Sequence, residues 1–341
     1  MGSDTRAVVG AAIIALTASG VVSTEARAQA TGAVQFRVDN DGFDFWLRPA
    51  QRPDGEYTNG VRMTTEFGRA PFWRLLAPHS PPCADVPDSA LRCSSALFTL
   101  GQDMYTPAED SQPYTYPGWR AQRPYAGWLY AGITLRSVRK STIRSIGLTL
   151  GVTGPPSLAE RAQQRAHEIM WRYTSPPLGW DTQVRFEPGV ILSARQRWLL
   201  FSGSVRGVRF MDAIVGAGAS VGNIVTNAEA SADVRFGVNL SHPWRRARRR
   251  GPVELVGVLG VRGQGIARNI FLDGNTIQPD RSVEAKPAIG DVHGSVGLRL
   301  GALVLAYAVT ERSREYATGP RSHTYGSVVL GIGGTPDVMG P

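Results

Sequence analysis

The feature that most restricts what this chain can fold into is a two-residue alternation of apolar residues with small or polar ones. It is clearest over residues 232–240, where every even-numbered residue is apolar and every odd-numbered one is small or polar. A period of two gives a strand one apolar face and one wetter face. In a soluble sandwich the polar face lies outside, whereas in an outer-membrane barrel the apolar face meets lipid and the polar face lines the lumen.

About twelve segments show this alternation. They span residues 33–40, 57–68, 95–105, 125–138, 143–153, 183–196, 198–210, 228–240, 253–268, 287–300, 302–313 and 322–332. Short connections, as at 139–142 and around Arg197, alternate with long ones at 41–56, 106–124, 154–182 and 269–286, the long 69–94 connection being the exception. Short turns at one end and long loops at the other predict an all-β, transmembrane, antiparallel β-barrel of about twelve strands.

The composition excludes several other classes of protein. A hydrophobic content of 42% is enough for a packed core and argues against disorder. The 39 Gly and 23 Pro residues are too many for a helical bundle. The net charge of +9, nearly all from Arg, favours anionic partners such as phospholipid head groups or phosphorylated glycolipid, although genomic base composition can also favour Arg.

The N-terminal segment predicts export. Residues 1–30 have a basic start, a ten-residue apolar run and a small-x-small cleavage site ending at Ala30, as in a secretory signal peptide. Cleavage there leaves a single barrel domain over 31–341. In an exported chain Cys83 and Cys93 are expected to form a disulfide.

One connection has a helical pattern instead. Ser157 and Glu160 are spaced as a capping box, and an Ala-, Arg-, Gln- and Glu-rich run follows to about residue 173. Gln163 and His167 are four residues apart and therefore share one helix face. We expect one short helix in an extracellular loop.

Polar residues of several kinds gather at one predicted rim. If the first strand rises from the periplasm, all odd-to-even connections lie at the outer end of the barrel. The segments 40–41, 57–60, 101–107, 123–128 and 163–167 then meet there. Each single Asp or Asn could be a turn former, but their coincidence at one end favours a site on a rigid scaffold.

The same segments, in order, resemble the outer-membrane lipid A 3′-O-deacylase family. The matching pieces are VDND (38–41), YTNG (57–60), GQDMYTP (101–107), QRPYAGWLY (122–130), GVTGPPS (151–157), QQRAH (163–167), GWDTQ (179–183) and, more weakly, RNIFLDGNT (268–276). The resemblance implies a twelve-stranded barrel in the Gram-negative outer membrane that hydrolyses an acyl ester, the 3′-linked acyloxyacyl chain, of lipid A. It also implies calcium as the cofactor and lipopolysaccharide as the partner.

The resemblance also implies roles for single residues. Asn40 and Asp41 fall on the family's acid–amide pair at the calcium and reaction centre, and Thr58 matches its active-site threonine. Gln163 and His167 match the helix that carries the general base. These residue types suit ester hydrolysis, because a neutral imidazole can take a proton from water near pH 7.

Two arginines are candidates for a lipid A phosphate, Arg123 and Arg120. The chain also departs from the family. No lysine follows GQDMYTP, and a glutamate is missing a few residues after the histidine of the helix. Glu187, just after GWDTQ, is a candidate to replace that glutamate at the metal.

Two other functions stay open at this point. A non-enzymatic barrel, either a pore or a scaffold, would have an open lumen with scattered charges. An outer-membrane phospholipase would need a Ser facing a His, and the G-x-S-x-G match at 218–222 lies in a β segment with no helix after it. The basic run 245–250 is expected in a periplasmic turn, so we expect no nucleic-acid partner. We also expect the protein to be a monomer.

Overall fold

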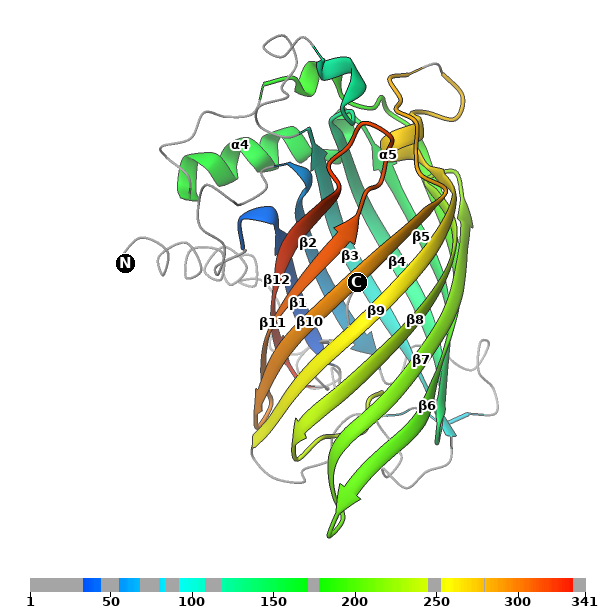
Figure 1. Cartoon of the computed structure of the whole chain (residues 1–341), viewed down its shortest axis with the longest axis vertical. Coiled ribbons are helices and arrows are strands. Elements are labelled where there is room, and N and C mark those ends of the chain that lie inside the picture. The colour runs from blue at the N-terminus through cyan, green and yellow to red at the C-terminus, as the bar shows by residue number, and fades with distance from the viewer. Residues whose placement is uncertain are drawn as a thin grey trace, which may run out of the picture.

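A computed structural model describes residues 33–43, 55–67, 80–81, 83, 92–107, 118–170, 178–244, 253–278 and 280–333. Within them, twelve strands form a closed barrel in which each strand pairs with the next and β12 closes on β1 (Figure 1). The strands are β1 (Val34–Asn40), β2 (Glu56–Phe67), β3 (Arg92–Thr106), β4 (Ala126–Arg139), β5 (Thr142–Thr153), β6 (Pro188–Val205), β7 (Val208–Gly222), β8 (Val225–Val238), β9 (Val253–Asn269), β10 (Ala288–Leu300), β11 (Leu303–Ser313) and β12 (Ser322–Ile332). Their pairings are antiparallel, so the predicted fold class and strand count are confirmed. The predicted signal peptide lies outside the described residues.

The turn expected around Arg197 was wrong. Arg197 lies inside β6, where it pairs with Ile143 of β5 and Gly216 of β7. Its charge is satisfied in the barrel, because the guanidinium donates to Asp233 at 2.7 Å. The turn comes nine and ten residues later, at Arg206 and Gly207, whose φ angles of 50° and 78° suit a two-residue hairpin.

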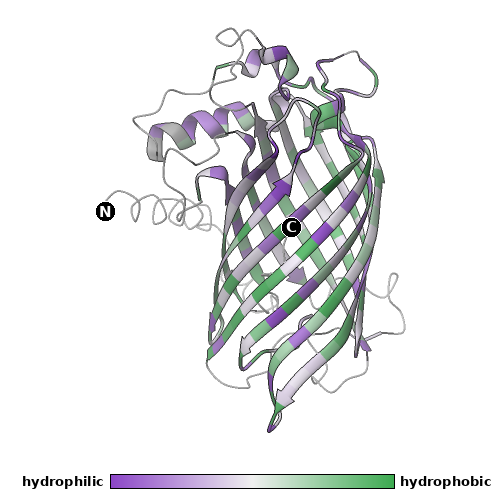
Figure 2. Cartoon of the chain, in the orientation of Figure 1, coloured by the Kyte–Doolittle hydropathy of each residue, from purple (hydrophilic) through white to green (hydrophobic). Residues whose placement is uncertain are grey.

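The two faces of the wall differ as the alternation predicts. Large apolar side chains point outward and are exposed, such as Ile146 at 65% and Leu259 at 61%. Inward side chains are charged and paired: Asp291 accepts from Arg312 at 2.8 Å and from Arg262 at 2.9 Å. Figure 2 shows hydrophobic and hydrophilic residues alternating along the strands. An apolar outer face around a polar interior is the pattern of an outer-membrane barrel.

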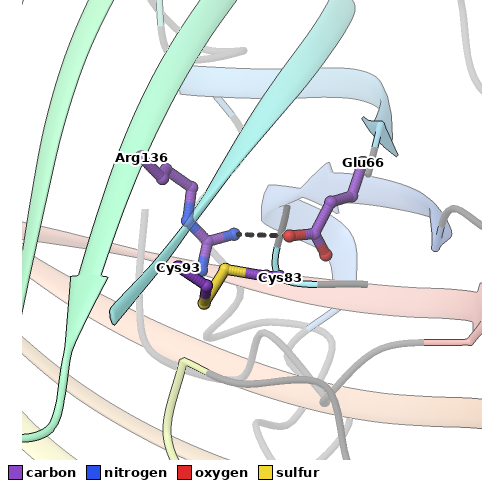
Figure 3. The surroundings of a disulfide bond; sticks show 4 residues. All are labelled: Glu66, Cys83, Cys93 and Arg136. Atoms are coloured by element: carbon purple, nitrogen blue, oxygen red, sulfur yellow. Dashed lines mark ion pairs between the residues drawn. A yellow bond between two sulfur atoms is a disulfide. The ribbon is translucent and has the colours of Figure 1, made fainter. Parts of the chain in front are cut away.

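The end of the lumen with the short turns is filled by apolar side chains. Trp244, after β8, packs with inward residues of strands on several sides of the barrel. The buried members are Cys93, Val138, Ile143, Ile214, Leu240, Trp244, Val256, Val258, Ala306 and Val329. Cys93 forms a disulfide with Cys83, beside an ion pair of Glu66 and Arg136 at 3.8 Å (Figure 3). Because β4 and β11 are distant in the strand order, their side chains meet only across the lumen.

A second apolar cluster fills the other end. The short helix α5 (Ile270–Asp273) places Phe271 in a cluster with Trp128 of β4 and Ile224 of the β7–β8 turn. The ring of Tyr105, on β3, stacks on Phe271 with centroids 4.5 Å apart. Charged pairs such as His293 with Asp233 at 2.9 Å lie between the two apolar clusters, and a further buried pair, Arg299 with Glu254 at 3.0 Å, lies beside the β10–β11 turn.

The helical segments lie in the long connections. They are η1 (Asp41–Phe43), η4 (Trp119–Ala121), η5 (Pro155–Ser157), α4 (Ala159–Met170) and η6 (Trp180–Thr182). α4 lies outside the barrel beside the outer end of the wall (Figure 1). None of the described helices is long and apolar enough to cross a membrane.

The start of α4 differs from the predicted capping box. Ser157 lies in η5, and its backbone N–H donates to Gly154 O at 2.9 Å. Leu158, with a φ of 60°, separates it from α4. The predicted helix is present, but it begins two residues after Ser157.

Candidate active site

Strand β3 shows which face of the wall carries the candidate residues. The ring of Tyr105 contacts Phe271, which follows β9 on the far side of the barrel, so Tyr105 points into the lumen. Its neighbours Met104 and Thr106 therefore point outward. Met104 is nonetheless only 3% exposed, because Ala159 of α4 and Trp180 of η6 pack over it. The outer face is thus covered at this point by the helical loop.

Asn40 and Thr58 lie together on this outer face. The Asn40 side-chain amide donates to Thr58 O at 3.1 Å, while its oxygen accepts from the Gly42 backbone N–H at 2.7 Å. The hydroxyl groups of Thr58 and Thr106 are hydrogen-bonded at 2.6 Å. All three side chains are buried. The predicted pair of residues is therefore joined by a third, Thr106, that the sequence reasoning did not single out.

A bulge in β2 adjusts the face on which Thr58 lies. The register of β2 with β3 shifts between Tyr57 and Asn59, so Thr58 is an extra residue. Tyr57 points into the lumen, where its hydroxyl donates to Asp39 at 2.9 Å. The bulge keeps Tyr57 on the inner face while it turns Thr58 outward toward Thr106, which is how bulges commonly re-aim a side chain.

Asp41 lies directly after β1 and begins η1. It is 6% exposed, and its carboxylate accepts from the backbone N–H of Gly55 at 2.8 Å. Gly55 has a φ of 122° and precedes β2. Asp41 thus ties the ends of β1 and β2 together next to Asn40.

The helix α4 is held against the outer wall by specific contacts. Gln102 of β3 donates to Ser157 O at 2.6 Å, and Gly127 of β4 has no space for a side chain, since a Cβ there would lie 2.2 Å from Ser157 Oγ. Gln163 is buried and accepts from the indole N–H of Trp180 at 2.8 Å. His167 lies on α4 one helical turn after Gln163. Trp180 is a second residue that the sequence reasoning missed, although it lies in the GWDTQ motif.

Arg123 lies on the lumen side. Its side chain is fully buried, and one guanidinium nitrogen contacts Glu56 at 3.0 Å and Glu315 at 3.2 Å. Burial alone would raise the pKa of Glu315, but the charges of Arg123 and Arg312 lower it below the usual range. Arg120, in η4, is exposed and stacks on the ring of Trp119 at 5.2 Å. The two predicted arginines therefore lie in different surroundings.

Glu187 lies across the barrel from Asn40. Its carboxylate accepts from Asn223 at 2.6 Å, from Asn275 at 3.2 Å and from the Thr276 backbone N–H at 2.7 Å. Burial alone would raise the pKa of Glu187, but these hydrogen bonds lower it below the usual range. They link the start of β6 to the β7–β8 turn and to the β9–β10 connection, and not to the end of β1.

Calcium requires more ligands than the described residues bring together. It takes about six to eight oxygen atoms, several from carboxylates. Within the described ranges no group of three or more His, Cys, Asp or Glu residues could hold a metal ion. Among the described residues, Asp41 supplies one carboxylate at the end of β1. The described residues alone therefore do not complete a calcium site.

Comparisons with known proteins bear on the family and the fold. A family model described as "Outer membrane protein LpxR" matches residues 9–333. The solved structure of LpxR from Salmonella typhimurium aligns with a TM-score of 0.70 and 17% identity, covering 88% of this chain and 99% of that one. The β domain of the Bordetella autotransporter BrkA aligns at a TM-score of 0.44 and 12% identity, covering 89% and 98%. No curated protein sequence matches.

The family match covers nearly the whole barrel, and the Salmonella structure has the same fold. The chain therefore belongs to the LpxR family of Gram-negative outer-membrane proteins, the lipid A deacylase family that its motifs resemble.

Proposed function

We propose that this protein is a calcium-dependent lipid A 3′-O-deacylase that hydrolyses the 3′-linked acyloxyacyl ester of lipopolysaccharide in the outer leaflet. The observation that carries the proposal is the position of the polar cluster. Asn40, Thr58 and Thr106 lie on the outer face of the wall, and Met104, the outward residue before Thr106, is covered by the helical loop that carries Gln163 and position 167. A lipid in the outer leaflet meets this face of the barrel directly, whereas a soluble substrate would enter a lumen.

The proposed reaction is attack of water on the ester carbonyl. His167 takes a proton from the water as the oxygen attacks, and the carbonyl becomes an oxyanion. When the tetrahedral intermediate collapses, the bond to the sugar oxygen breaks and the protonated imidazole returns the proton to that oxygen. The products are a free fatty acid and a lipid A with one free hydroxyl.

The other residues position the reactants. Asn40 holds the end of β1 against Thr58 through its amide NH₂, while its oxygen, which accepts one hydrogen bond from Gly42, keeps a second lone pair for a cation. The hydroxyl pair of Thr58 and Thr106 presents a polar surface to the ester. Calcium stays part of the proposal with Asp41 and Asn40 as its ligands from this chain, and when bound it would polarise the ester carbonyl.

Of the two arginines, Arg120 is the better placed for a lipid A phosphate, since it is exposed. Arg123 is proposed to support the site from inside, through its two carboxylate partners. Glu187 has its carboxylate engaged by three protein donors, so we propose a structural role for it and not a metal-binding one.

The alternatives fit the structure less well. A pore needs a continuous aqueous lumen, but apolar clusters occupy both ends of this one. The G-x-S-x-G motif marks a nucleophile only on a strand-to-helix elbow, and Ser220 lies within strand β7, which leads through a tight turn into β8.

Mass spectrometry of lipid A tests the proposal. Outer membranes containing the wild-type protein or His167→Ala are incubated with calcium or with a chelator. Loss of an acyloxyacyl mass only with wild type and calcium is the expected result. Gln164→Ala, on the exposed side of α4, is the matched control and should behave like the wild type. Unchanged lipid A in every arm, with correctly folded barrels, would refute the proposed activity.

A further inference from the structure

The indole of Trp180 determines which way the Gln163 side chain faces. An indole N–H can only donate, so the Gln163 atom 2.8 Å from it must be the carbonyl oxygen. If the amide were turned around, two donors would face each other in a buried environment, since Gln163 is 5% and Trp180 3% exposed. A buried donor without an acceptor is costly. The hydrogen bond therefore fixes the orientation of the amide.

This orientation decides what Gln163 can offer a ligand. With its oxygen bound to Trp180, the side chain presents its NH₂ group at its other edge. α4 packs on β3 through Ala159, which contacts the same cluster as Met104. Gln163 is one turn after Ala159, and Thr106 is the next outward residue after Met104 on β3. The NH₂ group thus belongs to the interface between α4 and the wall that carries the threonine pair.

Trp180 is itself held firmly. Its ring packs against that of Tyr125 with centroids 5.1 Å apart, and η6 is closed by a hydrogen bond from the Gln183 side chain to Trp180 O at 2.9 Å. The Tyr125 hydroxyl donates to Leu178 O at 2.7 Å, which anchors the segment just before η6. The indole N–H is therefore a donor with a defined position.

We propose that Trp180 is a positioning residue that locks Gln163 as a hydrogen-bond donor to the ester carbonyl oxygen as it becomes an oxyanion. This inference rests on the proposed deacylase function. Gln163 contacts the reacting atoms, whereas Trp180 acts only through Gln163. A donor aimed at a developing oxyanion contributes to kcat more than to substrate binding.

Four variants test the proposal in steady-state deacylation at pH 8. Gln163→Ala should lower kcat by about 100-fold or more, in line with loss of an oxyanion donor, with KM changed less than about threefold. Gln163→Glu keeps an acceptor for Trp180 but replaces the donor with a carboxylate, so it should lose about as much. Trp180→Phe keeps an aromatic ring and removes the N–H, so it should lower kcat about tenfold. Trp198→Phe is the matched control, because Trp198 pairs with Thr142 at the short β4–β5 turn, and it should stay within about threefold of wild type.

The decisive result is the double variant. If Trp180 acts only through Gln163, adding Trp180→Phe to Gln163→Ala should lower kcat less than about twofold further. An undiminished tenfold effect in that background would show that Trp180 only packs, and an active Gln163→Glu would show that no donor is needed. Either outcome overturns the proposal.

Hydrogen exchange of the Trp180 indole N–H separates this inference from the function on which it rests. The N–H should be protected in wild type and Gln163→Glu and exchange faster in Gln163→Ala. An inactive wild-type protein with this exchange pattern would refute the deacylase proposal and leave the amide orientation standing. Equal exchange in all three would refute the orientation whatever the activity.

Discussion

Replacing Arg123 with Met should destabilise the barrel strongly and in a pH-dependent way. The guanidinium is fully buried, and it contacts Glu56 at 3.0 Å and Glu315 at 3.2 Å, both carboxylates being 4% exposed. Removing one partner from a buried ion pair costs about 3–5 kcal/mol, since it leaves uncompensated charge behind. Met fills much of the volume of the Arg stem, so lost packing adds little.

The sign of the pH dependence follows from Glu315. In the wild type its pKa is lowered, because the charges of Arg123 and Arg312 outweigh the effect of burial. A lowered folded-state pKa contributes stability above the unfolded pKa of about 4.3, and this contribution is lost as the pH falls through the folded pKa. Without Arg123 the pKa of Glu315 rises, so the carboxyl is protonated at higher pH. The deficit of the variant should therefore be largest near pH 8 and smaller near pH 5.

The measurement is the free energy of unfolding in guanidinium chloride at pH 8 and pH 5, on protein refolded into detergent micelles and followed by Trp fluorescence. Arg120→Met is the matched control, since Arg120 is exposed, and should cost within about 0.5 kcal/mol. A deficit for Arg123→Met below about 1 kcal/mol, or one equal at both pH values, would contradict the assignment of a buried ion pair.

Three further predictions concern α4, the lumen and the disulfide. Gly127→Ala should reduce deacylation at least tenfold in a correctly folded barrel, because its Cβ would lie 2.2 Å from Ser157 Oγ and push the start of α4 off the wall. Gly263→Ala, whose Cβ would meet nothing within 4 Å, should leave activity unchanged in the same lipid A assay. The double variant Trp244→Ala/Phe271→Ala should produce conductance steps in planar bilayers that the wild type and both single variants lack, since the two side chains belong to the apolar clusters at the two ends of the lumen; a silent double variant would count against that role. Cys83→Ser should lower the free energy of unfolding by about 2–3 kcal/mol, and reductant should lower the stability of the wild type but not of the variant.

The architecture could be predicted from the sequence because a two-residue alternation is a local pattern. Each strand of a barrel shows the alternation of its inner and outer faces within about ten residues. Counting the alternating segments gives the twelve strands. The β6–β7 boundary could not be found this way. The charged residues around Arg197 resemble a turn, and only the partner Asp233 on β8 shows that this charge belongs inside the barrel.

The site was predictable in part because its motifs are also local patterns in the sequence. Asn40, Thr58 and Gln163 stand in motifs, and the order of the connections brings those motifs to one end. What a side chain binds depends on residues far away in the chain. Glu315 lies 192 positions from Arg123, and Asn275 lies 88 from Glu187, so nothing near either residue indicated that its charge is already engaged.

Thr106 and Tyr105 are adjacent in β3, but their side chains point to opposite faces of the wall. On the same stretch of wall, the side chains that hold the barrel together and those proposed to act on lipid occupy opposite faces. Asp39 and Asn40 are an example, since the first binds Tyr57 inside the lumen and the second binds Thr58 on the outer face. The outward residues can therefore be substituted to accept another membrane ester while the inward residues that stabilise the barrel stay unchanged.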